Sequence, residues 1–223
     1  MRHSSGGGVG SCRGSGSAEH LGGEIVNADS RQAYCGMDIG TAKPRADELS
    51  RVPHHLIDIR QLEAPLNAAE FARLARVAIA EVAARGRPVL VVGGSGLYLR
   101  AIRDGIFPAP PASAAIRAHL AVEAAQHGID HLFERLSAID PPAAARINRN
   151  DFKRIVRALE AHELTGLPLS EHQRRHQFAD SPFTTLTVGL TLPRESLYRA
   201  IERRFDAMIE QGLVSEVRRL RAS

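Results

Sequence analysis

The 223-residue sequence contains no apolar run long enough to cross a lipid bilayer. Its first residues also lack the charged-then-apolar layout of a secretory signal. Only two cysteines are present, Cys12 and Cys35, which is too few for a disulfide framework, and neither is expected to bind metal. These absences predict a cytoplasmic protein that does not enter a membrane.

Apolar side chains are scarce in residues 1–20, which are dominated by Gly and Ser. Such a segment cannot bury enough surface to offset the entropy of ordering, so we expect it to be disordered. Over the whole chain 43% of residues are hydrophobic, which is ordinary for a globular protein of one large or two small domains. An ordered fold is therefore expected from residue 21 onward.

Hydrophobic spacing predicts a strand–helix–strand unit in the first half of the chain. Residues 24–27 and 54–59 are short apolar segments typical of strands. Residues 68–84 carry apolar side chains at helical spacing, and Gly86 stands where a helix ends. The continuous apolar run 88–92 is typical of a strand buried on both faces of a parallel sheet.

The second half of the chain changes character after a Pro-rich link at 107–111. Helices are predicted over five ranges, namely 116–126, 131–138, 142–147, 151–165 and 170–176. Residues 184–192 alternate and are β-branched, which predicts a return to strand, and 194–220 predicts one long amphipathic helix. We therefore expect an α/β core from 21–108 and 183–223, and a helical insertion at 109–182.

Positive charge is modest in total, because 29 Lys and Arg face 25 Asp and Glu for a net charge of +4. It is concentrated late in the chain, at Arg146, Arg149, Lys153, Arg154, Arg157, Arg174 and Arg175. Clustered cations on helices favour contact with a nucleic-acid backbone. A solvated helix surface explains the same charges equally well.

Candidate chemistry lies in residues 22–44, where Asp29 and Ser30 follow the predicted strand 24–27. Asp29 is a candidate general base, although an Asp at this place is also a common helix cap. Residues 93–98, GGSGLY, end the strand 88–92 and place glycines at the carboxyl edge of the sheet, where α/β proteins bind ligands. This pairing suggests group transfer from a phosphate ester or diphosphate, while the glycines alone fit helix packing equally well.

Several longer sequence segments resemble those of a known protein family. They are DSRQAY, GMDIGTAKP, PHHLIDI, VLVVGGSGLYL, DPPAAARIN, RNDFKRIVRALE and RAIERRFDAM. With them the chain resembles the tRNA dimethylallyltransferase family, also called tRNA isopentenyltransferases, which attach a prenyl group to an adenosine beside the anticodon. The resemblance implies an α/β fold, a P-loop-NTPase-like parallel sheet core of nucleotide- and ATP-binding type, with an all-helical insertion. It also implies a tRNA anticodon stem-loop and dimethylallyl diphosphate as partners, Mg²⁺ as cofactor, and a monomer.

The resemblance assigns roles residue by residue. Asp29 is expected to take a proton from the exocyclic amine of the adenosine, Ser95 to keep the hydroxyl of the family's usual Thr, and Arg204 to neutralise the leaving diphosphate. The tRNA contacts are expected from Asp29, Ser30, Arg31, Gln32, Ser95, Arg117, Asp151, Phe152, Lys153, Arg154 and Ile155.

Simpler roles remain open for several of these residues. Arg117 and Arg154 could be exposed helix residues, Arg204 could pair with a neighbouring carboxylate, and Asp151 could cap its helix. The adjacent His54 and His55 point to opposite faces of a strand, so a structural role is expected for both.

The sequence departs from the family pattern in its first residues. The motif G-x-x-x-x-G-K-[ST] is absent, and Gly10 stands where the family has its lysine. Compared with the family, the chain is expected to be truncated at both ends. Three interpretations are therefore open: a tRNA prenyltransferase, a catalytically impaired tRNA-binding fragment of that family, or an unrelated P-loop kinase acting on nucleotides or small metabolites.

Overall fold

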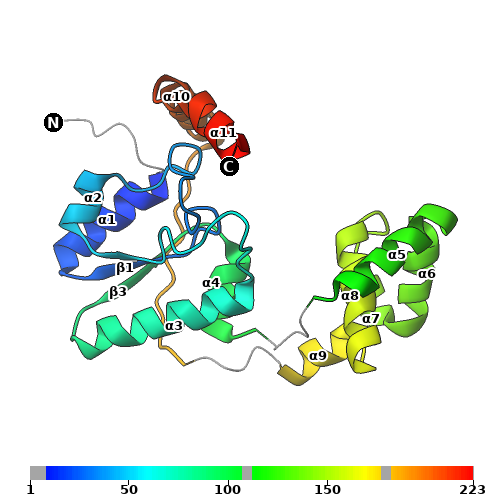
Figure 1. Ribbon diagram of the computed structural model, residues 1–223. Coiled ribbons are helices and arrows are strands. Elements are labelled where there is room, and N and C mark those ends of the chain that lie inside the picture. The colour runs from blue at the N-terminus through cyan, green and yellow to red at the C-terminus, as the bar shows by residue number, and fades with distance from the viewer. Residues whose placement is uncertain (1–8, 107–111, 177–181, 223) are drawn as a thin grey trace. The chain divides into compact units, whose positions relative to one another are not determined.

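A computed structural model describes residues 9–106, 112–176 and 182–222, apart from the side chains of residues 9–13 and 176. Residues 1–8 of the predicted disordered segment and the Pro-rich link at 107–111 lie outside the described residues. The chain divides into two compact units (Figure 1). We call residues 1–104 with 182–223 the α/β unit and residues 105–181 the helical unit.

A parallel sheet forms the centre of the α/β unit. Its three strands are β1 (Glu24–Asn27), β2 (His54–His55) and β3 (Val89–Val92), in the order β2-β1-β3. The predicted α/β class with a parallel sheet core is confirmed. The strand predicted over 54–59 is wrong beyond His55, because Leu56 and Asp58 have φ angles of 65° and 55°, which extended backbone does not adopt.

Helices cover both faces of this sheet (Figure 1). On one face, α3 (Ala68–Ala84) buries Phe71, Ala75 and Val82, and its first turn is capped by the Asn67 side chain. The helix occupies the range that its apolar spacing predicts. After β3, α4 (Gly96–Asp104) runs alongside α3.

The opposite face is covered by α1 (Val9–Leu21), in a segment for which the composition predicts disorder. That expectation is wrong for these residues. Ala18 is fully buried in a cluster with Ile25 and Val52, and a Cβ atom on Gly14 would lie 2.9 Å from the Val92 methyl groups. Small side chains thus let α1 lie close on the strands, and this packing supplies the burial that the local sequence does not reveal.

The last part of the α/β unit differs from its prediction in two ways. Residues 184–192 form no strand, and Leu186 and Val188 are 92% and 72% exposed. The helix predicted over 194–220 is interrupted, so that α10 (Arg194–Glu210) and α11 (Leu213–Ala222) are separate. Gly212, with a φ of 101°, turns the chain between them.

Short helices build the helical unit, and each corresponds to a predicted one. They are α5 (Ala114–His127), α6 (Ile129–Ile139), α7 (Pro141–Ala144), α8 (Phe152–Thr165) and α9 (Leu169–His176). Their core includes Leu120, Leu132, Leu136, Ile155 and Leu159, all with no exposed surface. Among the described residues of both units, no helix is sufficiently long and apolar to cross a membrane.

The α/β unit also contains one short helix that was not predicted, α2 (Ala46–Arg51).

Candidate active site

Asp29 lies two residues beyond the end of β1 and is half-buried. Its Oδ1 accepts a hydrogen bond from the backbone N–H of Arg31 at 2.8 Å, inside a turn in which no helix begins. The helix-cap alternative therefore does not describe this residue. Its second carboxylate oxygen, Oδ2, accepts no hydrogen bond from the described residues, so it is available to a ligand.

Asn27, the last residue of β1, holds the backbone on either side of Asp29. Its Oδ1 accepts from the Asp29 N–H at 3.1 Å, while its Nδ2 donates to the Asp29 and Leu56 carbonyls at 3.2 and 3.1 Å. The side chain is buried, with 4% exposure. Asn27 was not among the predicted site residues, although a polar residue at the end of an apolar strand is a signal that the sequence contains.

Ser95 joins the ends of β1 and β3. Its Oγ accepts from the Ser30 N–H at 2.9 Å, and its N–H donates to the Ala28 carbonyl at 3.2 Å. Gly93 makes this approach feasible, because a Cβ atom there would lie 2.2 Å from the Ala28 carbonyl carbon. The structure thus brings the turn containing Asp29 and the glycine-lined end of β3 together at the carboxyl edge of the sheet.

Gln32 anchors the other end of the Asp29 turn. It is 8% exposed, and its Nε2 donates to the carbonyls of Thr41 and Ala42 at 3.1 and 3.3 Å. Its polar group is therefore engaged with the loop 36–43. Arg31, by contrast, is exposed at the surface of the turn.

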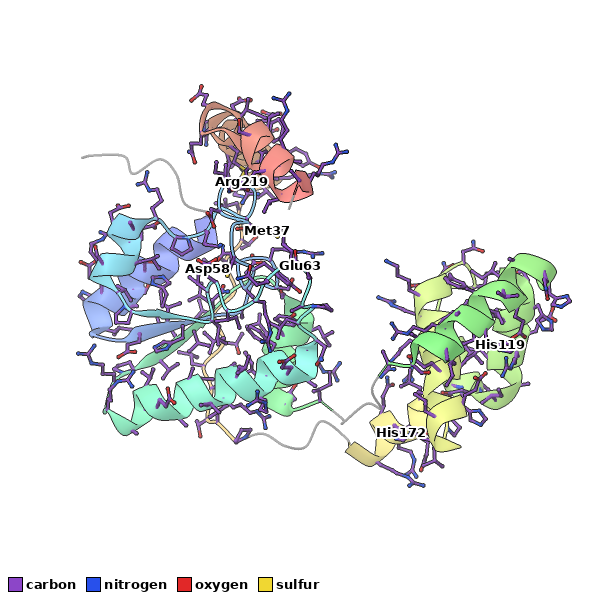
Figure 2. All side chains as sticks on the ribbon, in the orientation of Figure 1. Met37, Asp58, Glu63, His119, His172 and Arg219 are labelled. Carbon is purple, nitrogen blue, oxygen red and sulfur yellow. The ribbon has the colours of Figure 1, made fainter. Side chains whose placement is uncertain are left out.

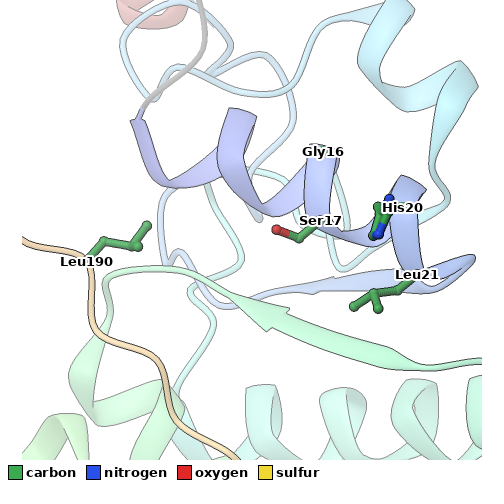
Figure 3. Close-up of a pocket in the computed structure, with 5 residues that line it drawn as sticks. All are labelled: Gly16, Ser17, His20, Leu21 and Leu190. Carbon is green, nitrogen blue, oxygen red and sulfur yellow. The ribbon is translucent and has the colours of Figure 1, made fainter.

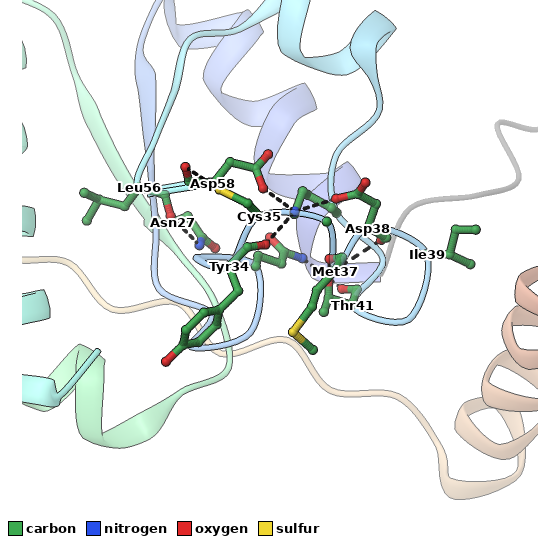
Figure 4. Close-up of polar contacts among 12 residues, drawn as sticks. Asn27, Tyr34, Cys35, Met37, Asp38, Ile39, Thr41, Leu56 and Asp58 are labelled. Carbon is green, nitrogen blue, oxygen red and sulfur yellow. Dashed lines mark hydrogen bonds and ion pairs between the residues drawn. The ribbon is translucent and has the colours of Figure 1, made fainter. Parts of the chain in front are cut away.

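Lys43 is the buried cation of this loop, and its partners Tyr34, Asp38 and Asp58 are labelled in Figure 4. Its Nζ lies 2.6 Å from Asp38 Oδ1 and 2.5 Å from Asp58 Oδ1, and it donates to the Tyr34 carbonyl at 2.9 Å. Burial by itself lowers the pKa of Lys43, but the hydrogen bonds to the two carboxylates outweigh it and raise the pKa above its usual value. Lys43 therefore holds the loop together as a permanent cation.

The two histidines of β2 have structural roles, as expected. His54 lies 2.7 Å from the Val52 carbonyl through Nδ1, and burial lowers its pKa. His55 Nε2 lies 2.7 Å from the buried Glu24 carboxylate, which also pairs with Arg85. The hydrogen bond from His55 is the main reason that the pKa of Glu24 lies below its usual value.

Arg204 is exposed on α10, and within the described chain it makes no hydrogen bond or ion pair. The helix packs on α11. The structure therefore does not join Arg204 to Asp29 or Ser95, nor does it pair Arg204 with Glu202 or Asp206.

Arg117 lies in the helical unit, where it forms a bidentate ion pair with Glu160 at 2.8 and 3.0 Å. Glu160 has no exposed surface and also accepts from Arg157 and from the Ser113 N–H. Burial pushes the pKa of Glu160 upward, but these hydrogen bonds outweigh it, and the net pKa lies below 4.5. The guanidinium of Arg117 thus joins α5 to α8.

The segment 151–155 divides between surface and core. Asp151 caps α8 by accepting from the Arg154 N–H at 3.1 Å. Lys153 and Arg154 are exposed, and the Arg154 side chain retains 72% of its surface. Phe152 packs against the helical core and Ile155 is fully buried in it. Ile155, which was expected to contact tRNA, has no exposed surface, and Lys153 and Arg154 are the residues of this segment that present positive charge to a partner.

Neither of two cavities in the described structure is lined by Asp29. One of about 540 Å³ is lined by Gly16, Ser17, His20, Leu21 and Leu190 (Figure 3). The other, of about 390 Å³, lies in the helical unit beside His119, His127 and His131. In the parts of the chain that the structure describes, no group of three or more His, Cys, Asp or Glu residues could hold a metal ion.

Comparison with known proteins gives the ancestry of this arrangement. The family model described as IPP transferase matches residues 32–223. A tRNA dimethylallyltransferase of Geobacter metallireducens is 52% identical over 203 residues, which are 91% of this chain and 66% of the relative. One from Geobacillus thermodenitrificans is 48% identical over 204 residues, covering 91% and 64% of the two chains. The chain thus spans just under two thirds of the length of these curated relatives.

Solved structures agree. The tRNA isopentenylpyrophosphate transferase of Bacillus halodurans is 39% identical with a TM-score of 0.62, and the match covers 97% of this chain and 68% of that one. A eukaryotic dimethylallyltransferase acting on tRNA is 27% identical with a TM-score of 0.76, over 96% of this chain and 53% of that one. These matches favour the predicted transferase ancestry over an unrelated P-loop kinase. The chain belongs to the IPP transferase family.

Proposed function

We propose that this chain acts in the transfer of a dimethylallyl group from dimethylallyl diphosphate to the exocyclic amine of the adenosine beside the anticodon of tRNA. The position of Asp29 carries the proposal. The turn that contains it follows a central strand and is joined to Ser95 and Gly93 through Ser30 and Ala28, and the carboxylate keeps one oxygen free of hydrogen bonds from the described chain. Relatives named tRNA dimethylallyltransferase support the same assignment.

The chemical step assigned to Asp29 is proton removal. As the amine nitrogen bonds to the allylic carbon, the bond from that carbon to the diphosphate oxygen breaks and the diphosphate leaves. The proton lost by the nitrogen goes to Asp29 Oδ2, which makes Asp29 the general base. Asn27 fixes the backbone of Asp29 and the Arg31 N–H bonds to its carboxylate, so that little reorganisation is needed when the amine arrives.

Substrate binding is assigned to both units. Ser30 and Arg31 present the edge of the Asp29 turn to the nucleotide, while Lys153 and Arg154 of α8 attract the phosphate backbone. Arg204 is proposed to neutralise the leaving diphosphate on the strength of the family resemblance. Mg²⁺ is proposed, on the strength of the family resemblance, as a companion of the diphosphate, which would supply oxygen ligands to it. We further propose a cytoplasmic monomer.

The test is incubation of the purified chain with dimethylallyl diphosphate, Mg²⁺ and unmodified tRNA, followed by mass spectrometry of the nucleosides. Asp29→Asn keeps the shape of the side chain but removes the base, so prenylated adenosine should fall at least about 100-fold. Asp47→Asn, an exposed change of the same kind on α2, should leave the yield unchanged. Equal product from Asp29→Asn and the wild type would refute the base assignment.

A second candidate, tRNA binding without transfer, is favoured by the exposed cations of α8. It predicts that the wild-type chain binds an anticodon stem-loop RNA but yields no prenylated product. Binding measured by fluorescence anisotropy beside the transfer assay distinguishes the two candidates.

A further inference from the structure

Glu216 of α11 is a buried carboxylate that the transfer chemistry does not use. Its Oε2 accepts from the backbone N–H groups of Asp38 and Ile39 at 2.9 and 2.8 Å, and its Oε1 accepts from that of Gly40 at 2.9 Å. Only 5% of the residue is exposed. Three successive amides around one carboxylate form a strong and directional anchor, because a hydrogen bond to a charged acceptor is stronger than one to a neutral acceptor.

The surface of α11 fits closely against this loop. A Cβ atom on Gly40 would lie 3.1 Å from Leu213 Cδ1 and 3.4 Å from Glu216 Oε1. Gly36, with a φ of 76°, lies against Leu220, and its carbonyl accepts from Arg219 at 3.4 Å. Figure 2 labels Arg219 on α11 and Met37, the residue that follows Gly36. Glycine at positions 36 and 40 thus lets the helix seat on the loop at several points.

The same loop is also hydrogen-bonded to the turn that contains Asp29. Asp38 donates its N–H to Glu216 and accepts from Lys43 through its side chain, so both its backbone and its side chain are fixed. The next carbonyls along the loop, from Thr41 and Ala42, accept from Gln32. Hydrogen bonds at 38–40 and at 41–42, linked by the backbone between them, therefore connect α11 to the turn that contains Asp29.

We propose that Glu216 is a positioning residue for the Asp29 turn. By fixing the amides of 38–40 it places the carbonyls of 41 and 42, and these hold Gln32 three residues beyond Asp29. Glu216 does not touch substrate, and its effect passes through Gln32. The inference rests on the proposed function in one respect, which is that the positioned turn presents Asp29 to the adenosine.

Glu216→Gln tests the coupling, because the amide keeps the shape of the side chain but replaces one acceptor oxygen with a donor. Hydrogen exchange of the full chain should become about tenfold faster at the amides of 38–40 and of 30–34, with the helical unit unchanged. Glu210→Gln, an exposed change of equal charge on α10, is the matched control and should alter neither segment. Faster exchange confined to 38–40 would overturn the proposal.

Kinetics separate positioning from general stability. In the transfer assay Glu216→Gln should lower kcat about tenfold while KM for dimethylallyl diphosphate stays within about twofold, because the geometry of the base is altered and the donor site is not. The double variant with Gln32→Leu should be no slower than the slower single variant, since both act through one route. Additive losses would overturn that route.

The exchange measurement needs no substrate, so the two proposals fail separately. Loosening of 30–34 in Glu216→Gln supports the coupling even where the wild-type chain transfers no prenyl group, an outcome that contradicts only the proposed function. Should Glu216→Gln not fold, Gly40→Ala takes its place, because its added methyl group would lie 3.1 Å from Leu213 Cδ1 and 3.4 Å from Glu216 Oε1 and crowds this contact without a change of charge. It should give the same pattern of exchange, and faster exchange at 38–40 with unchanged exchange at 30–34 would again overturn the coupling.

Discussion

The helical unit and the α/β unit bury their apolar side chains to different extents. Leu120, Leu132 and Leu136 of the helical unit have no exposed surface, whereas Leu186 and Val188 of the α/β unit are 92% and 72% exposed. The apolar residues of α10 are also partly open, with Leu197, Ile201 and Phe205 exposed by 41%, 45% and 55%. The helical unit is thus packed more completely than the end of the α/β unit.

The difference follows from how far apart the packing partners lie in the chain. Helices α5 to α9 follow one another directly, and each makes its own backbone hydrogen bonds before it packs. A strand depends on a neighbouring strand for the same bonds. Alternating residues at 184–192 therefore specify an apolar face, but they do not by themselves create a strand.

The largest expected effect comes from a core truncation that contrasts the two units. Leu159→Ala should lower the free energy of unfolding of the helical unit by about 2–5 kcal/mol, because the fully buried side chain leaves a cavity. Leu186→Ala should change stability by no more than about 0.5 kcal/mol. Hydrogen exchange of the full chain in increasing urea reports each unit separately, and equal losses would contradict the difference in packing.

Two neighbouring glycines test how closely the ends of β1 and β3 approach each other beside Asp29 in the α/β unit. Gly93→Ala should destabilise the sheet by about 3 kcal/mol, because its methyl group meets the Ala28 backbone, which cannot rotate away. The methyl group added by Gly94→Ala would have no heavy atom within 4 Å, so this variant should lose far less stability. Exchange of the β1 amides measures both, and a Gly93→Ala protein as stable as Gly94→Ala would show that the two strand ends do not approach so closely.

The buried carboxylate of the helical unit predicts a pH dependence. Since the pKa of Glu160 is below its ordinary value of 4.5, its ion pairs stabilise the unit fully above that pH, and the contribution is lost as pH falls through the folded-state pKa. Glu160→Gln should cost about 1–2 kcal/mol at pH 7 and flatten the loss of stability toward acid.

Urea unfolding followed by exchange of α8 at several pH values measures this effect. Glu134→Gln, an exposed change on α6, is the control and should keep the wild-type profile. A Glu160→Gln protein that loses stability as steeply as the wild type would assign the acid sensitivity to other groups.

The smallest expected effect concerns RNA binding. Arg154→Ala should lower the salt slope of anticodon stem-loop binding by about one, as expected for one lost phosphate contact. Arg199→Ala removes an equally exposed cation from α10 of the α/β unit and should leave the slope unchanged. Equal slopes for both variants would remove α8 from the proposed RNA surface.

The helices and strands that were predicted correctly are those whose sequence pattern lies within the segment itself. The helix 68–84 was predicted at its observed bounds, because apolar spacing and a following glycine act locally. The parallel strands at 24–27 and 89–92 were predicted from their apolar runs. The helix at 9–21 was not, since its small residues become stabilising only against Val92 and Ile25.

Some residues of the candidate site were predicted from the sequence and others were not, for the same reason. Asp29 and Ser95 were predicted from short strings that end in a turn, and the structure joins their turns through Ser30. Ile155 was misplaced because a family string does not say which side of a helix faces the core. Lys43 and Glu216 were missed, since the value of a charged residue depends on partners that lie far along the chain.

The sequence by itself determined the helical periods, the turn residues and the family strings, all of which act within a few residues. Only the tertiary structure decided that α1 covers the sheet, that 184–192 stays without a strand partner in the described chain, and that Glu216 holds the loop beside Asp29. The physical reason is that burial and hydrogen bonding between distant segments have no local signature. They arise only when the chain brings those segments together.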